Sequence, residues 1–248
     1  MTRRGLCAGL LASIAASGRA RAQEPEPPPA VYPTLPREAA SPQGFVPEGW
    51  AIEREASGDV DGDGIGDAVF VMRQRAPRNI LRPYGPDGPA LDTNPRLLVV
   101  ASGRREGGPY RLALANHTLI PRHETITVED PFGEESRGLE TKRGAFSVWL
   151  HRFAAAGGRD MGHAKLTFRL AGPRCELIGF ERLTVDRFGG ETVMVSVNYS
   201  TGRIRRETGH IGKDETRVVW ARRPKSRLLA IEEVGDGLAF DPESPHRA

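Results

Sequence analysis

The stretch from Val193 to Arg205 reads VMVSVNYSTGRIR, and it predicts a β-hairpin. Apolar side chains recur at every second position from Val193 to Val197, which is the period of a strand with one buried face. A short loop that contains Gly202 follows, and Arg203 begins a second run with the same period. The loop is too short for a crossover, so these strands are expected to pair antiparallel.

The chain after residue 50 continues with similar strand-like sequence patterns. Short runs rich in Val, Ile, Leu, Phe and Thr alternate with Gly, Pro, Asn and Asp, and no run shows an evident helical period. Such runs, joined mostly by short connections, predict antiparallel sheets in a propeller-like or sandwich arrangement. We therefore expect a single all-β domain over residues 50–241 with about 11 strands. They are predicted at Trp50–Ala56, Ala68–Gln74, Arg96–Ser102, Tyr110–Asn116, Ala145–Arg152, Lys165–Ala171, Glu176–Arg187, Thr192–Tyr199, Arg203–Glu207, Thr216–Ala221 and Leu228–Glu232.

The ends of the chain differ from this domain. A charged start, an apolar run over residues 6–16 and the small-x-small site Ala20-Arg21-Ala22 predict a signal peptide over residues 1–22. Residues 23–49 carry closely spaced prolines, which deny both helix and ladder hydrogen bonds, so we expect a disordered leader. Residues 242–248 are expected to form a disordered tail. A signal peptide predicts a periplasmic or extracellular location in a bacterium.

Composition excludes several classes of protein. The chain has 35 basic and 32 acidic residues. The predicted signal peptide holds four of the arginines and no acidic residue, so the exported part is close to neutral. That balance argues against a polycationic nucleic-acid binder, and no second apolar run reaches the length of a membrane span. Cys175 is the only cysteine after the signal peptide, which rules out an internal disulfide.

The most specific motif is the loop from Asp59 to Asp67, which reads DVDGDGIGD. Calcium prefers six to eight oxygen ligands, and carboxylates at relative positions 1, 3, 5 and 9 can wrap one ion. Gly64 at position 6 permits the sharp turn, and Ile65 at position 7 would offer its backbone carbonyl. The alternative is a solvated acidic turn that binds nothing. The predicted calcium ligands are Asp59, Asp61, Asp63, Ile65 and Asp67.

The exit from this loop distinguishes it from an EF-hand. The glutamate expected at position 12 is replaced by Phe70, within the apolar run from Ala68 to Met72, so the loop leads into a strand. In this form residues 50–74 resemble the calcium loops of FG-GAP and VCBS-type repeats of integrin-like β-propellers, in a single copy. That resemblance implies bound calcium between two strands of one blade. More loosely, this loop together with residues 96–100, 130–132 and 198–202 is similar to a group of uncharacterised secreted bacterial proteins, which implies export and β structure but no particular activity.

Two further features offer candidate sites. Motifs of the common hydrolases and nucleotide-binding proteins are absent, but the long connection at residues 117–144 holds His117, His123, Glu124 and Asp130. These groups would serve a secreted or periplasmic hydrolase if they converged. Residues 203–227 are locally basic, which would suit an anionic envelope or extracellular ligand, although a solvated outer face is the favoured explanation. The arginines concerned are Arg203, Arg205, Arg206, Arg222 and Arg223.

These observations favour a non-enzymatic binding or interaction module that calcium stabilises, with a hydrolase as the alternative. Whether the chain is an enzyme is left open by its sequence.

Overall fold

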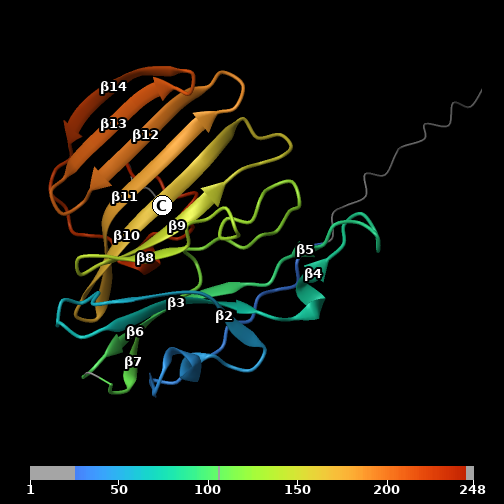
Figure 1. Cartoon of the computed structure of the whole chain (residues 1–248), viewed down its shortest axis with the longest axis vertical. Helices are drawn as coiled ribbons and strands as arrows, with labels where there is room; N and C mark the ends of the chain where they lie inside the picture. The colour runs from blue at the N-terminus through green and yellow to red at the C-terminus, as the bar shows by residue number, and fades with distance from the viewer. Residues whose placement is uncertain (1–25, 106, 244–248) are drawn as a thin grey trace, which may run out of the picture.

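The computed structural model describes residues 26–105 and 107–243, and within them the fold is all-β. Fourteen strands form antiparallel sheets of five, seven and two strands (Figure 1). The predicted signal peptide lies outside the described residues. The described residues contain no helix that is long and apolar enough to cross a membrane.

The five-stranded sheet has the order β1-β7-β6-β3-β2. Its strands are β1 (Glu38–Ala39), β2 (Trp50–Gly58), β3 (Asp67–Gln74), β6 (Arg96–Gly103) and β7 (Tyr110–Asn116). The two-stranded sheet pairs β4 (Ile80–Leu81) with β5 (Leu91–Asp92), after a 3-10 turn η2 (Pro77–Asn79). This pair lies within the long connection of residues 75–95.

The seven-stranded sheet runs in reverse chain order from β14 to β8. Every neighbour in it is a hairpin partner, as the sequence predicts for residues 193–205. Its strands are β8 (Leu139–Thr141), β9 (Phe146–Arg152), β10 (Asp160–Ala171), β11 (Arg174–Asp186), β12 (Glu191–Asn198), β13 (Arg203–His210) and β14 (Lys213–Arg222).

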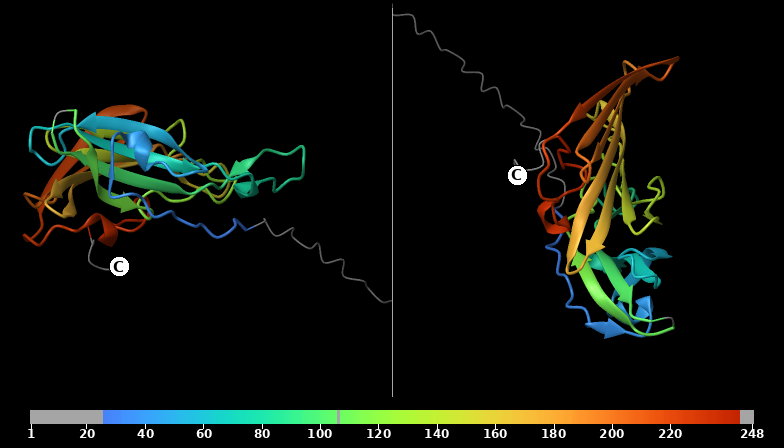
Figure 2. Two further views of the ribbon diagram at one scale, coloured as in Figure 1. Left: turned by 90° about the horizontal axis from the view of Figure 1, so that it is seen from below. Right: turned by 90° about the vertical axis from the view of Figure 1, so that its left-hand side faces the viewer.

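Both large sheets bury apolar side chains in one shared core, as expected for packed antiparallel sheets. Val69 and Leu98 reach it from the smaller sheet, and Val148, Leu166 and Phe180 reach it from the larger one. The two sheets meet at an angle (Figures 1 and 2). Because the core is built from both, neither sheet is a separate unit.

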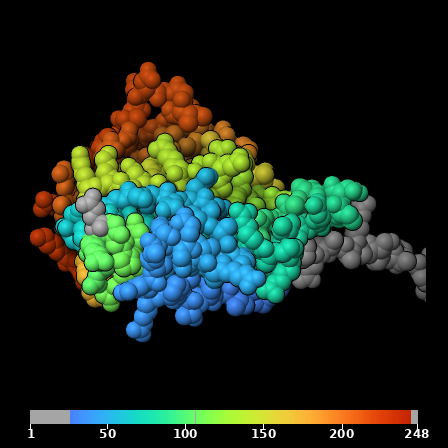
Figure 3. Space-filling model, turned by 60° about the horizontal axis from the view of Figure 1, so that its bottom comes forward, coloured from blue at the N-terminus to red at the C-terminus, as the bar shows by residue number. Residues whose placement is uncertain are grey.

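The other face of the smaller sheet forms a second core, and this finding corrects the prediction of a disordered leader. Phe70 and Met72 of β3 point to this face, where Leu35 and Phe45 cover them. Strand β1 pairs with β7, and Pro42–Phe45 forms the 3-10 turn η1. Figure 3 shows the blue N-terminal segment lying over this part of the molecule. The prolines prevent a long ladder, but they leave a few apolar side chains free to pack.

A second correction concerns the predicted strand Leu228–Glu232. Only an isolated bridge, Glu176 to Ala230, forms there, and a 3-10 turn η3 (Ile231–Glu233) follows. Ile231 and Val234 both lie in the shared core, and their spacing of three residues fits the 3-10 turn rather than a strand. The start of the predicted tail also packs, because Pro242 is buried and its carbonyl accepts a hydrogen bond from the Tyr199 hydroxyl at 3.1 Å. Residues 244–248 lie outside the described residues.

Candidate functional site

The aspartate loop connects β2 to β3, so a strand follows it as predicted. Gly62 and Gly64 both have φ of +85°, a left-handed conformation that a residue with a Cβ rarely adopts. Their backbone N–H groups donate to the two carboxylate oxygens of Asp59, at 2.6 and 3.0 Å. The glycines therefore let the loop fold back around its first carboxylate.

Three carboxylates converge in this loop. Asp59, Asp61 and Asp67 each place an oxygen within 4.8 Å of the other two, and this group can hold a metal ion. Loss of hydration raises the pKa of Asp61, and the charges of Asp63 and Asp59 act in the same direction. Burial raises the pKa of Asp67, although two backbone N–H groups oppose the shift. A bound cation would relieve this electrostatic cost.

The other two predicted ligands are placed differently. Asp63 is exposed and is not part of the three-carboxylate group. One of its oxygens accepts the backbone N–H of Ile65 at 2.7 Å, while its own N–H donates to Asp61 at 3.2 Å. The structure thus brings together Asp59, Asp61 and Asp67, and it uses Asp63 to shape the turn that carries Ile65.

Asp67 has a structural role that the sequence does not reveal. It is buried, and its oxygens accept the N–H groups of Val60 at 2.8 Å and Gly103 at 3.0 Å. Gly103 ends β6, and a Cβ there would collide with the Gly66 carbonyl oxygen and lie 2.8 Å from Cγ2 of Ile65. The loop therefore packs directly against the backbone of residue 103, where a side chain would not fit. A glycine at a strand end is the sequence signal for such a close approach.

The loop is also attached to the larger sheet. Val60 is fully buried in the shared core, and its carbonyl accepts the N–H of Leu170 in β10 at 3.3 Å. Asp67 accepts the N–H of Val60 in a hydrogen bond. Val60 therefore connects a candidate metal ligand to both sheets. The second position of the motif, which the calcium pattern leaves unconstrained, thus anchors the loop.

An open cavity of about 610 Å³ adjoins the loop. Asp61 and Asp63 line it, together with Gly172 and Pro173 from the turn after β10. Arg104 and Arg111 also line the cavity. Water or a ligand therefore has access to the two exposed carboxylates.

The residues of the hydrolase alternative do not form one cluster. Both oxygens of Asp130 accept hydrogen bonds from Arg96 at 2.7 Å, and this buried guanidinium lowers the pKa of Asp130 despite its burial. Nε2 of His123 bonds to the Val128 carbonyl at 2.7 Å, and the ring of His117 packs against Tyr32. Within the described residues, no set of three His, Cys, Asp or Glu side chains other than the loop aspartates comes together closely enough to hold a metal.

The predicted basic surface is partly neutralised. Two of its arginines form ion pairs, Arg205 with Glu207 and Arg206 with Glu243. Two others lie over aromatic rings, Arg203 over Trp220 at 4.8 Å and Arg223 over Tyr199 at 5.1 Å. Arg222 is exposed. These arginines are therefore distributed over both faces of the sheet and are mostly engaged within the chain.

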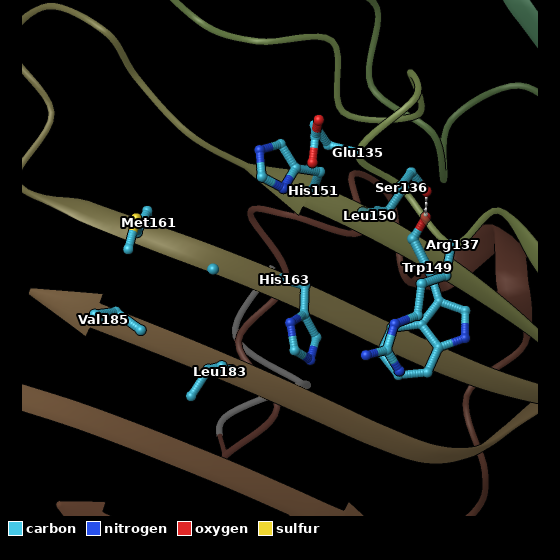
Figure 4. A pocket seen from close by; sticks show the side chains of 11 residues that line it. Glu135, Ser136, Arg137, Trp149, Leu150, His151, Met161, His163, Leu183 and Val185 are labelled. Carbon is cyan, nitrogen blue, oxygen red and sulfur yellow. Dashed lines mark hydrogen bonds between the residues drawn. The ribbon is translucent and has the colours of Figure 1, made fainter. Parts of the chain in front are cut away.

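A second hollow, of about 320 Å³, lies on the larger sheet where residues 135–137 cross β9 to β11. Its floor includes Met161, Leu183 and Val185, and its edge carries Trp149 (Figure 4). The guanidinium of Arg137 lies 4.7 Å from the centre of the Trp149 ring, and the ring of His163 packs against it at 5.2 Å. Burial lowers the pKa of His163, and the charge of Arg137 acts in the same direction, so this position disfavours the protonated imidazole.

The residue pattern of β9 is the sequence signal for this hollow. Along β9, Val148 and Leu150 enter the shared core, so Trp149 and His151 must face the opposite side. An aromatic and a histidine on the nominally polar face of a strand indicate a second, shallower packing surface. His151 bonds there to Glu129 at 2.8 Å.

Comparison with known proteins identified no relative: no protein-family model, no curated protein and no solved structure matches the chain. The assignment of a role therefore depends on the geometry of the sites.

Proposed function

We propose that this chain is an exported β-domain that calcium stabilises and that binds another molecule in the bacterial envelope or outside the cell. The observation that carries the proposal is the convergence of Asp59, Asp61 and Asp67 in a loop whose glycines take the required turn. Oxygen ligands on an irregular loop suit calcium, which accepts variable coordination geometry, better than magnesium, which demands a tight octahedron.

The stabilising role follows from where the loop is attached. Asp67 holds Val60, and Val60 contacts both the shared core and β10. A cation that fixes the loop would therefore also fix the junction of the two sheets. Repulsion between the carboxylates weakens this junction when no ion is bound.

A binding role is favoured over catalysis because the candidate catalytic side chains are engaged separately. Asp130 is held by Arg96, and His123 is held by a backbone carbonyl. The hollow beside Trp149 instead offers apolar floor residues with a few polar groups at the edge, which is the usual composition of a ligand site. We assign the binding surface to this hollow rather than to the basic stretch, where two of the five arginines form ion pairs and two others lie over aromatic rings.

Scanning calorimetry tests the calcium assignment. Without the position-12 glutamate we expect a Kd of about 0.1 mM, toward the weak end of the range for such loops. At about 1 mM calcium, binding should raise the free energy of unfolding by RT ln(1 + 10), roughly 1.4 kcal/mol. For a domain of this size Tm should rise by about 3 to 6 °C relative to the sample in EGTA.

Asp61→Asn should abolish this rise, because Asp61 is an exposed member of the group with little other work in the fold. Asp87→Asn, an exposed aspartate in the β4–β5 connection, should leave the rise intact. Magnesium at the same concentration should have little effect. A wild-type melting curve that calcium leaves unmoved, with no calcium found in the protein by elemental analysis, would contradict the proposal.

A further inference from the structure

Strand β14 is a long strand at an open sheet edge. It ends the seven-stranded sheet, and all ten of its residues, Lys213–Arg222, are exposed. Among the described segments only β13 packs extensively against it. In Figure 1 it is the outermost strand at the top of the molecule. Its outer backbone N–H and C=O groups therefore have no ladder partner within the described chain.

The other sheet edges are protected. Strand β8, at the opposite end of the same sheet, has three residues, and its Thr141 hydroxyl donates to the Ser57 carbonyl of β2 at 2.6 Å. Strand β1, which ends the smaller sheet, has only two residues. Short or covered edges are the usual protection against pairing with another chain. Strand β2, the other edge of the smaller sheet, has nine residues, but β8 packs against it and its Arg54 side chain donates to the Gly133 carbonyl. Within the described residues, β14 is therefore the large-sheet edge that is both long and without a covering segment.

The middle of β14 is apolar on both faces. Val218 and Trp220 lie opposite Glu207 and Arg205, on the outer face, and Val219 lies opposite Arg206 on the face of the shared core. The three side chains are 41%, 57% and 46% exposed. An isolated exposed apolar residue needs no explanation, but three in succession at an open edge indicate a contact surface.

We propose that two copies of this chain pair antiparallel through β14 about a two-fold axis at Val218. A two-fold axis perpendicular to the sheet does not exchange the two faces of the sheet. Each side chain of one β14 therefore lies opposite a side chain on the same face of the other β14. Val218 then faces Val218 of the second copy, and Thr216 faces Trp220. Asp214 faces Arg222, and the symmetry forms this pair twice.

Neighbouring registers are less favourable. An axis at Arg217 would place two guanidinium groups directly opposite each other, which is destabilising in a sheet. An axis at Val219 would pair Val218 with Trp220, but Asp214 would then face Pro224, so the strand overlap would be shorter and the Asp214–Arg222 pair would be lost. The Val218 register alone combines nearly full strand overlap with two opposite-charge pairs.

The pairing closes on itself. Each copy contributes the long uncovered edge of its described sheets, so no comparable edge remains among the described strands of the dimer and it should not grow into a filament. The two seven-stranded sheets would become one continuous sheet. This inference is independent of the calcium proposal, because β14 contributes nothing to the aspartate loop.

Light scattering after gel filtration tests the pairing. The full chain at about 100 µM should have twice the monomer mass, and dilution should dissociate it, because dimer formation depends on concentration. Val218→Arg places two like charges on the axis and should give a monomer with an unchanged circular dichroism spectrum. Phe188→Ser, which removes another large exposed apolar side chain, should leave the dimer intact.

A charge swap tests the register. Asp214→Arg and Arg222→Asp each create two like-charge pairs, so each should raise the dimer Kd by at least about tenfold, and the double variant should restore it. A monomeric wild-type chain, a dimer unaffected by Val218→Arg, or oligomers larger than two would each overturn the proposal. A dimer that Val218→Arg dissociates but that both single swaps leave unchanged would overturn the register.

Discussion

At the scale of single residues, Asp67 combines two tasks. It is one of the three carboxylates that can hold a cation, and it also accepts two backbone N–H groups that close the loop. Replacing Asp67 would therefore remove a metal ligand and also break the hydrogen bonds that close the loop, so the two effects could not be separated. Gly103, one of its two donors, separates these effects more cleanly, because it touches the loop without contributing a carboxylate.

Gly103→Ala should destabilise the protein by about 1 to 3 kcal/mol, because the new Cβ would overlap the Gly66 carbonyl and crowd Ile65. The loop must move away, so calcium affinity should also fall. Gly66→Ala is the matched control: an added Cβ there has no neighbour within 4 Å, and the change should stay within about 0.5 kcal/mol. Urea unfolding measures both variants, and equal effects would show that Gly103 is not a close contact.

At the scale of elements, residues 35–49 are part of the folded domain and are not a separate leader segment. Phe45 is 1% exposed, and its ring lies 6.3 Å from that of Phe70 in β3. This contact explains why β3 is buried on both faces and reads as a continuous apolar run rather than an alternating one.

Phe45→Ala should lower the free energy of unfolding by about 3 to 5 kcal/mol, the usual cost of emptying a buried aromatic site. Val31→Ala, in the same segment but at a side chain that is 65% exposed, should cost less than about 0.5 kcal/mol. Limited proteolysis should likewise spare residues 35–49 in the wild type and cleave them in the Phe45 variant. Rapid cleavage in the wild type would mean that the segment does not stay docked.

At the scale of the whole molecule, the shared core joins the sheets into one cooperative unit. Its members come from β3 and β6 as well as from β9 to β12, and the aspartate loop adds Val60. The buried Arg96 strengthens the same junction, since it joins Glu53 of β2 to Asp130 of the long connection.

Calorimetry should therefore show a single unfolding transition, as expected for one core. Single-tryptophan variants give a sharper test. Trp50 reports on the smaller sheet and Trp149 on the larger one, so chains that retain only one of them should melt at the same temperature by fluorescence. Calcium should shift both midpoints equally. Two separate midpoints would contradict the shared core.

The sequence by itself determined the local structure. Short runs rich in Val, Ile, Leu, Phe and Thr, bounded by Gly, Pro, Asn and Asp, predicted ten of the strands, because strand and turn preferences are properties of neighbouring residues. The aspartate and glycine spacing predicted a loop between strands, and Asp59, Asp61 and Asp67 do converge there.

Only the tertiary structure decided which distant segments meet. Nothing near Phe45 in the sequence shows that β3 has a second face to cover, and nothing near Asp130 shows that Arg96 will bind both its oxygens. The same holds for Val60 and Gly103, whose roles depend on the approach of β10 and of the loop. Such contacts join residues far apart in the chain, so local pattern carries little information about them, and packing of the whole core selects them.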